Sequence, residues 1–312
     1  MVSFQSQKIL KGAFPMIMVY SLLTFACWGI ADLFYKKGNI TASKYNDIKT
    51  GIIVGIVMGI HALIYLIVNQ VNISLAEMVK YLPISFCYIS SMVIGYKALK
   101  YIELSIASPV QNTSGVITSI LLLIFFKETL PPIAYLAFIL IFVAIFYICM
   151  LEKKEDKEER KFEIGATKKV KILAIVLPLI YCLLDGLGTF LDGVYLDKLE
   201  IISEDNALVC YEFTFLIFAF FAFLFLKSKG EKVNIFKEKE KIEAAIFETG
   251  GQFFYVFAMA GNSTISASIV GSYCILSMIL SRIFLKEKLS LKKYFAIAMA
   301  IVGLIILCIL DV

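Results

Sequence analysis

Charged residues are scarce in this 312-residue chain. They make up 18% of it, while 60% of the residues are hydrophobic and the mean hydropathy is +0.85. A typical soluble domain carries about 25% charged and 45–50% apolar residues. The composition therefore excludes an ordinary cytosolic enzyme, a disordered chain and a secreted disulfide scaffold, and it predicts an integral membrane protein.

Residues that carry chemistry in enzymes are equally few. The chain has one histidine, His61, and its seven cysteines lie in apolar runs without a Cys-x-x-Cys or Cys/His spacing. Such spacings mark disulfide frameworks and zinc sites. The phosphate-binding pattern GxxxxGK[ST] does not occur either. We expect no catalytic residues, no metal and no cofactor, which disfavours an intramembrane enzyme. For His61 a buried structural role is favoured over a proton relay.

Long hydrophobic runs dominate the sequence instead, and each suits one membrane-spanning helix of about 20 residues. The ten runs are 14–35, 50–68, 81–99, 105–126, 132–151, 171–191, 206–226, 242–260, 263–285 and 291–310. A charged stretch divides them into two sets of five. We expect a first repeat over 1–151, a solvated linker over 152–170 and a second repeat over 171–312.

The two halves resemble each other in sequence. With an offset of 159 and no gaps, residues 125–130 (FFKETL) fall on residues 284–289 (FLKEKL). Because each half has five spans, an odd number, the two copies cross the membrane in opposite senses. Inverted repeats of this kind belong to transporters, with the substrate site near the midplane. The sequence predicts an all-α membrane protein of ten helices, arranged as two inverted five-helix repeats around a central cavity.

A Lys-Glu-x-Leu step before the last helix of each half, together with Trp28-Gly29 in the first helix, resembles the drug/metabolite transporter superfamily, EamA type. The resemblance covers almost the whole chain. It implies a secondary active transporter whose cavity is lined mainly by helices 1, 3, 4, 6, 8 and 9. It also implies cytoplasmic termini, as in most characterised relatives.

Beyond the first two residues of each apolar run, four carboxylates lie within the runs, namely Asp32, Asp185, Glu212 and Glu248. A carboxylate at a helix centre costs about 2.5–3.5 kcal/mol on insertion scales, so it faces the bundle interior and is a functional candidate. Asp185 and Glu248 lie deepest; Asp32 is near the end of its run, where water can reach it. Asp192, just past the sixth run, is counted with the outer face. No Lys or Arg lies deep in a run, which favours a bound cation or proton.

Aromatic side chains supply a second signal, since their faces attract cations and form cages for quaternary ammonium groups. Tyr181 and Asp185 are spaced i, i+4, and Glu248, Gln252 and Tyr255 form a stripe on one helix face. The predicted substrate-binding residues are Trp28, Tyr88, Gln111, Tyr181, Asp185, Glu248, Gln252, Tyr255 and Tyr273. Asp185, Glu248 and Glu212 are the candidates for coupling to a proton or cation.

An acid before a Tyr-bearing stripe and the Ser272-Tyr273 pair resemble the choline-importing branch of this superfamily. The favoured function is therefore a secondary active transporter of a small organic cation or zwitterion, with a choline-like amine preferred. The alternative is an exporter of amino acids or hydrophobic metabolites with the same fold, whose acids handle only protons. Import or export, the coupling ion and the cargo all remain open.

The expected partners are a small-molecule substrate and the lipid bilayer, and no nucleic acid. The chain is a monomer or a homodimer. Gly51, Gly55 and Gly59, spaced four apart, predict a packing face within the monomer or in a dimer. The Lys/Ile-rich, Trp-poor composition favours a bacterial cytoplasmic (inner) membrane, which the chain crosses many times.

The basic residues give the orientation. One set of loops holds 25 of the 30 Lys/Arg, and the opposite face holds only Lys8, Lys11, Lys80, Lys127 and Lys198. Cytoplasmic loops carry the Lys/Arg excess. This bias predicts both termini outside, the reverse of what the family resemblance implies.

This orientation predicts the labelling of an introduced cysteine. Lys157→Cys, on the basic side, resists a membrane-impermeant maleimide in intact cells and reacts after lysis. Glu200→Cys, on the opposite face, is the control and reacts in intact cells. Rapid labelling of the first variant in intact cells reverses the predicted topology.

Overall fold

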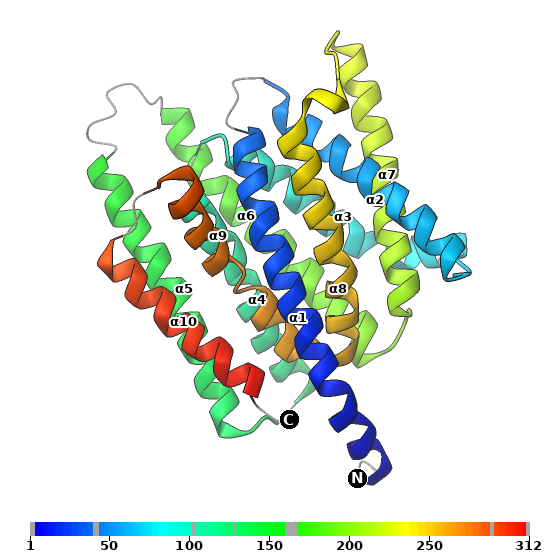
Figure 1. Cartoon of the computed structure of the whole chain (residues 1–312), viewed down its shortest axis with the longest axis vertical. Helices are drawn as coiled ribbons and strands as arrows, with labels where there is room; N and C mark the ends of the chain where they lie inside the picture. Colours follow the sequence, from blue (N-terminus) through cyan, green and yellow to red (C-terminus); the bar gives the residue numbers. More distant parts are fainter. Residues whose placement is uncertain are drawn as a thin grey trace.

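The computed structural model in Figure 1 describes residues 4–39, 44–101, 104–127, 129–159, 168–287 and 290–309. Within these residues the chain is helical and has no strand. Its long helices are α1 (Phe4–Asn39), α2 (Asn46–Val68), α3 (Leu75–Ala98), α4 (Leu104–Phe126), α5 (Pro132–Glu159), α6 (Lys168–Gly193), α7 (Glu204–Ser228), α8 (Lys239–Val270) and α10 (Leu291–Ile309). Shorter elements are η1 (Val194–Lys198), η2 (Ile235–Lys237), α9 (Cys274–Leu280) and η3 (Ser281–Leu285).

Six stretches of the described residues are long and apolar enough to cross a membrane. They are Met16–Asn39, Asn46–Val68, Leu75–Ala98, Val176–Lys198, Glu204–Ser228 and Lys239–Leu285. The last has 47 residues, about twice the length that one span needs, and it covers two predicted runs. Shorter apolar helices lie at Thr113–Phe126 and Pro132–Tyr147. The chain is thus an all-helical membrane protein, and the number of ten spans stays a prediction.

The longest stretch is divided at Asn262, where the sequence predicts the gap between two runs. Asn262 has φ −163° and ψ 90°, an extended backbone inside α8. Its side-chain oxygen accepts a hydrogen bond from the Ile265 N–H at 3.1 Å, as an N-cap does. The Asp197 carboxylate accepts a second one from the Ser263 N–H at 2.8 Å. The segment after Asn262 therefore begins as a new, capped helix.

A second break follows at residues 271–273, between α8 and α9. The N–H groups of Ser272 and Tyr273 donate to carbonyls three residues back, at 3.1 and 2.9 Å, which tightens the turn as in a 3₁₀ helix. A Cβ on Gly115 of α4 would lie 2.8 Å from the Gly271 Cα. Helix α4 therefore meets this break backbone to backbone, which only a glycine permits.

Helix pairing shows a regular pattern. Helix α1 packs on α8 and α3 packs on α6, while α2 packs on α7 and α5 on α10; α4 contacts α9 and, more extensively, α6, α8 and α5. Exchanging helices 1–5 with helices 6–10 leaves the pairs α1–α8, α3–α6, α2–α7, α4–α9 and α5–α10 unchanged as a set. In Figure 1, α1 begins near the bottom of the view and α6 begins at the top. The two halves thus start from opposite ends of the bundle.

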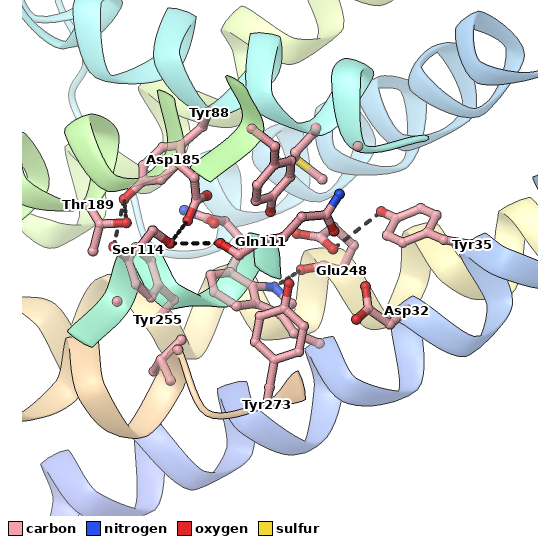
Figure 2. Close-up of a pocket in the computed structure, with 18 of the residues that line it drawn as sticks. Asp32, Tyr35, Tyr88, Gln111, Ser114, Asp185, Thr189, Glu248, Tyr255 and Tyr273 are labelled. Carbon is pink, nitrogen blue, oxygen red and sulfur yellow. Dashed lines mark hydrogen bonds between the residues drawn. The ribbon is translucent and has the colours of Figure 1, made fainter. Parts of the chain in front are cut away.

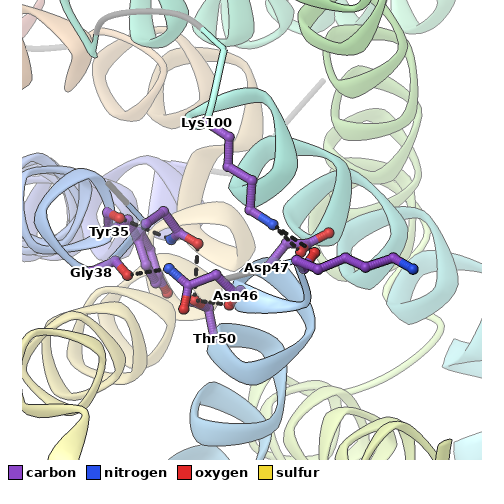
Figure 3. Close-up of polar contacts among 8 residues, drawn as sticks. Tyr35, Gly38, Asn46, Asp47, Thr50 and Lys100 are labelled. Atoms are coloured by element: carbon purple, nitrogen blue, oxygen red, sulfur yellow. Dashed lines mark hydrogen bonds and ion pairs between the residues drawn. The ribbon is translucent and has the colours of Figure 1, made fainter. Parts of the chain in front are cut away.

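Polar contacts hold the upper ends of α1, α2 and α3 together (Figure 3). The Asn46 side chain donates to the Gly38 carbonyl at 2.7 Å, which joins α2 to the last turn of α1. Lys100, just past α3, pairs with Asp47 of α2 at 2.5 Å. These contacts fix the end of α1 that carries Asp32 and Tyr35.

The predicted linker of residues 152–170 is helical at both of its ends. Helix α5 continues to Glu159 and α6 begins at Lys168. Glu and Lys are strong helix formers, so the charge run extends α5 beyond its apolar part. Residues 160–167 lie outside the described part of the chain, and the domain boundaries stay a prediction.

The glycines of α2 pack within this chain, against α7. A Cβ on Gly55 would lie 2.4 Å from the Phe215 carbonyl oxygen and 2.7 Å from the Ala219 Cβ. A Cβ on Gly51 would meet a ring carbon of Phe218 at 3.0 Å. The Gly55 contact is with the backbone of α7, which cannot move alone, whereas the Phe218 ring at Gly51 can rotate.

This difference predicts unequal effects of the same substitution in one helix. Gly55→Ala forces α2 and α7 apart and lowers the free energy of unfolding by about 1–3 kcal/mol, the usual cost of overpacking. Gly51→Ala is the matched control and costs less. Thermal unfolding of both variants in detergent tests the order, and equal melting temperatures contradict the packing of α2 on α7.

Candidate functional site

A cavity opens in the middle of the bundle, between α1, α3, α4, α6, α7, α8 and the break at residues 271–273 (Figure 2). Every substrate-binding residue predicted from the sequence lies in its wall: Trp28, Tyr88, Gln111, Tyr181, Asp185, Glu248, Gln252, Tyr255 and Tyr273. The wall also contains Asp32, Tyr35, Met92, Tyr96, Ser114, Thr189 and Tyr211. The predicted residues come from α1, α3, α4, α6, α8 and the break at residues 271–273, and their role in binding stays a prediction.

Two carboxylates of the wall come from different helices, Asp185 from α6 and Glu248 from α8. The Ser114 hydroxyl of α4 donates to Asp185 at 2.7 Å. The Tyr35 hydroxyl of α1 donates to Glu248 at 3.3 Å, and Tyr96 in turn donates to Tyr35 at 3.1 Å. Both carboxylates are thus held by hydroxyl groups of neighbouring helices.

Asp32 is the third carboxylate of the wall, although it lies near the end of its apolar run. It accepts hydrogen bonds from the hydroxyls of Ser108 in α4 and Ser277 in α9, at 2.6 and 2.7 Å. It is partly exposed, as a side chain in a cavity wall is. The short distance to the end of its run was misleading, because the chain packs α4 and α9 around that position.

No basic side chain of the described residues forms an ion pair with these three carboxylates. The ion pairs found there join Lys49 to Glu231, His61 to Glu212, Lys100 to Asp47, Lys198 to Asp197 and Lys241 to Glu238. Uncompensated carboxylates in an apolar bundle require a proton or a cation. The cavity can therefore supply negative charge to a ligand.

Aromatic rings surround the same space. Trp28 packs against Tyr255 with ring centroids 5.0 Å apart and against Tyr273 at 5.8 Å. Tyr88 lies edge-on to Tyr211 at 5.9 Å. The Trp28 indole N–H donates to the Glu248 carbonyl oxygen at 3.3 Å, which fixes the orientation of the ring. Aromatic faces beside carboxylates are the usual environment for an alkylammonium group.

Two amide groups in the wall lack a protein partner. The side-chain nitrogens of Gln111 and Gln252 are buried without a hydrogen bond, and the two residues are 6% and 3% exposed. A buried donor without an acceptor costs about 1–3 kcal/mol. A ligand with an acceptor atom, or water, would satisfy them.

Glu212, the third coupling candidate, lies apart from this wall. It is fully buried on α7 and lies 2.8 Å from the Nδ1 of His61 on α2. His61 and Glu212, which the sequence analysis treats separately, therefore form one pair between α2 and α7. His61 itself is partly exposed, and its structural role stays a prediction.

Asp192, which the sequence analysis counts with the outer face, lies within α6 and is 0% exposed. The apolar run seemed to end because of the aspartate itself, whereas α6 continues to Gly193 and is followed by η1. Asp185, Thr189 and Asp192 follow the i, i+4, i+7 pattern of one helix face. That stripe was the signal that could have identified Asp192.

Apolar helices long enough to cross a membrane thus surround a cavity with a polar wall. Residues 15–150 match the model of the EamA-like transporter family. The matched residues are less than half of the chain, and the model describes a family of membrane transporters. The match spans α1 to α5, the first predicted repeat. The resemblance to the choline-importing branch stays a prediction.

A solved crystal structure of a protein has a similar fold. The alignment covers 93% of this chain and 95% of the solved chain, with a TM-score of 0.63 and 12% sequence identity. At this identity the likeness concerns the fold alone. No curated protein matches the chain.

Neighbouring glycines of α8 provide a test of the aromatic wall. A Cβ on Gly251 would lie 2.3 Å from the Trp28 Cδ1, whereas a Cβ on Gly250 would meet only the Cys27 Sγ, at 3.8 Å. Gly251→Ala therefore displaces the indole and shifts its fluorescence emission, and Gly250→Ala leaves it unchanged. Trp28 is the only tryptophan, so the signal is unambiguous. Identical spectra of the two variants contradict this placement of Trp28.

Proposed function

We propose that this protein is a secondary active transporter of small organic cations or zwitterions, with a choline-like quaternary amine as the favoured cargo. The observation that carries the proposal is the cavity of Asp32, Asp185 and Glu248, which has aromatic walls and no basic partner among the described residues. An anionic cargo such as a sugar phosphate would need Lys or Arg in that place.

The aromatic rings favour an alkylated cation over a metal ion. A bare metal ion needs several oxygen ligands within about 2.6 Å, and no group of acids, cysteines and histidines in the described residues could hold one. Trp28, Tyr255 and Tyr273 instead offer ring faces and edges. A quaternary ammonium group, which cannot donate a hydrogen bond, is stabilised by such faces and by diffuse negative charge.

The unpaired amide groups indicate that the cargo also carries a hydrogen-bond acceptor. The nitrogens of Gln111 and Gln252 are donors, so the cargo that satisfies them carries a hydroxyl or carboxylate oxygen besides its positive charge. An alkylammonium alcohol or a betaine meets both requirements. A simple tetraalkyl cation leaves the amides without partners.

The helix pairing supports the rest of the proposal, which is ten spans in two inverted repeats that rock around the cavity. The pairs survive an exchange of the two halves, and the halves start from opposite ends of the bundle. A helix broken at Gly271, in the wall of the cavity, is the kind of discontinuous helix that forms substrate sites in such transporters. We place the protein in a bacterial inner membrane on composition alone.

Binding to purified protein tests the cargo class. Choline or glycine betaine raises the melting temperature and changes Trp28 fluorescence. Glu248→Gln weakens binding by at least about tenfold, equivalent to about 1.4 kcal/mol, because it removes a negative charge from the cavity. Glu240→Gln is the matched control, since Glu240 is exposed in the first turn of the same helix.

The alternative cargo makes the opposite prediction. If neutral amino acids shift the melting temperature while choline and betaine do not, the cation proposal is wrong. An exporter of amino acids or hydrophobic metabolites then remains, and Glu248→Gln leaves its binding largely intact.

A further inference from the structure

We propose that Asp192 is a proton-binding site, separate from the carboxylates that face the cargo, and that its protonation is transmitted to the cavity through Tyr88. This inference rests on the proposed transport function and assigns its coupling ion.

Asp192 lies in the last turn of α6 and is completely buried. The Tyr81 hydroxyl donates to its Oδ1 at 2.5 Å, and the Tyr88 hydroxyl lies 3.4 Å from its Oδ2. Both tyrosines belong to α3. The carboxylate is thus surrounded by hydroxyl dipoles in an apolar bundle, where a full negative charge is costly and a proton is the simplest ligand that removes it.

The charged and titratable groups around Asp192 come from each helix packed against it. They are Tyr81 and Tyr88 of α3, Tyr255 of α8, Asp185 two turns earlier in α6, and the Asp197–Lys198 pair of η1. Lys198 lies 2.6 Å from Asp197. Helix α4 contributes the apolar Leu122 against Gly193. Within the described part of the chain, Asp192 itself forms no ion pair with a basic side chain.

Tyr88 connects this site to the cavity, because its ring lies in the cavity wall. Its hydroxyl lies 2.6 Å from the Tyr255 hydroxyl and 3.3 Å from that of Thr189, both in the same wall. Figure 2 shows Tyr88, Thr189 and Tyr255 together on one side of the cavity. One hydroxyl thus contacts Asp192 on one side and two cavity residues on the other.

A tyrosine hydroxyl has one proton to donate. When Asp192 is ionised, Tyr88 donates to it and accepts from Tyr255. When Asp192 carries a proton, it donates to Tyr88, and Tyr88 then donates to Tyr255 or Thr189. Protonation therefore reverses the direction of the hydrogen bonds in the wall. The affinity for cargo changes with it, and by linkage cargo changes the affinity for the proton.

Infrared spectroscopy tests the proton site without knowledge of the cargo. Purified wild-type protein shows a protonated carboxylic-acid band that disappears as pH rises, and Asp192→Asn lacks one component of it. Glu200→Gln, an exposed acid near the same end of α6, is the control and keeps the wild-type spectrum. An unchanged titrating band in Asp192→Asn overturns the proposal.

Transport in proteoliposomes tests the coupling, with radiolabelled choline as the probe. Asp192→Asn keeps choline exchange, but the ratio of uptake rates with and without a pH gradient falls to about 1, which means no coupling. If Asp192→Asn does not fold, Tyr81→Phe provides the test. This variant keeps choline exchange and shifts the pH at which the gradient stimulates uptake. Wild-type stimulation by the gradient in Asp192→Asn, or a wild-type pH dependence of that stimulation in Tyr81→Phe, overturns the proposal. Failure of the wild-type protein to bind choline or betaine contradicts the proposed cargo instead, and the infrared result still decides for Asp192.

Discussion

The free-energy cost of carboxylates inside an apolar bundle is the constraint on which this structure depends. The chain meets that cost with hydroxyl groups rather than with basic side chains, and every donor comes from another helix. The pairs are Ser108 and Ser277 with Asp32, Ser114 with Asp185, Tyr35 with Glu248, and Tyr81 with Asp192. These hydrogen bonds join α1, α3, α4, α6, α8 and α9 around one cavity.

Because each carboxylate bridges helices, its charge is tied to how the helices are arranged. A ligand or proton that neutralises Glu248 changes the strength of the hydrogen bond that joins α8 to Tyr35 of α1. At the cavity, Gly115 and Gly271 bring α4 and α8 into backbone contact, where small residues permit closely packed alternatives. A ligand shifts such an equilibrium only by its differential affinity for the two states. Charge compensation in the cavity is the term that supplies this difference under the proposed function.

The sequence was informative where chemistry followed helical spacing and uninformative where it did not. The stripe of Glu248, Gln252 and Tyr255 was predictable because three polar residues on one face of a membrane helix must point inward. Tyr35, Tyr96 and Tyr211 of the wall could not be singled out, since the chain has 16 tyrosines and apolar spans lack a polar face that marks their orientation. Asp192 was counted outside the sixth run because an acid was taken as the end of a helix that continues beyond it.

Glu212 and Glu248 differ in what surrounds their carboxylates. Both Glu212 and Glu248 are buried in apolar helices, and the sequence treats them alike. Glu212 lies 2.8 Å from His61, so its charge is met within the fold. Glu248 has a tyrosine hydroxyl at 3.3 Å and an open cavity on its other side. A charge that the fold leaves unmatched beside a cavity must be matched by what enters, and under the proposed function this is why a cation is expected in the cavity and not at the α2–α7 pair.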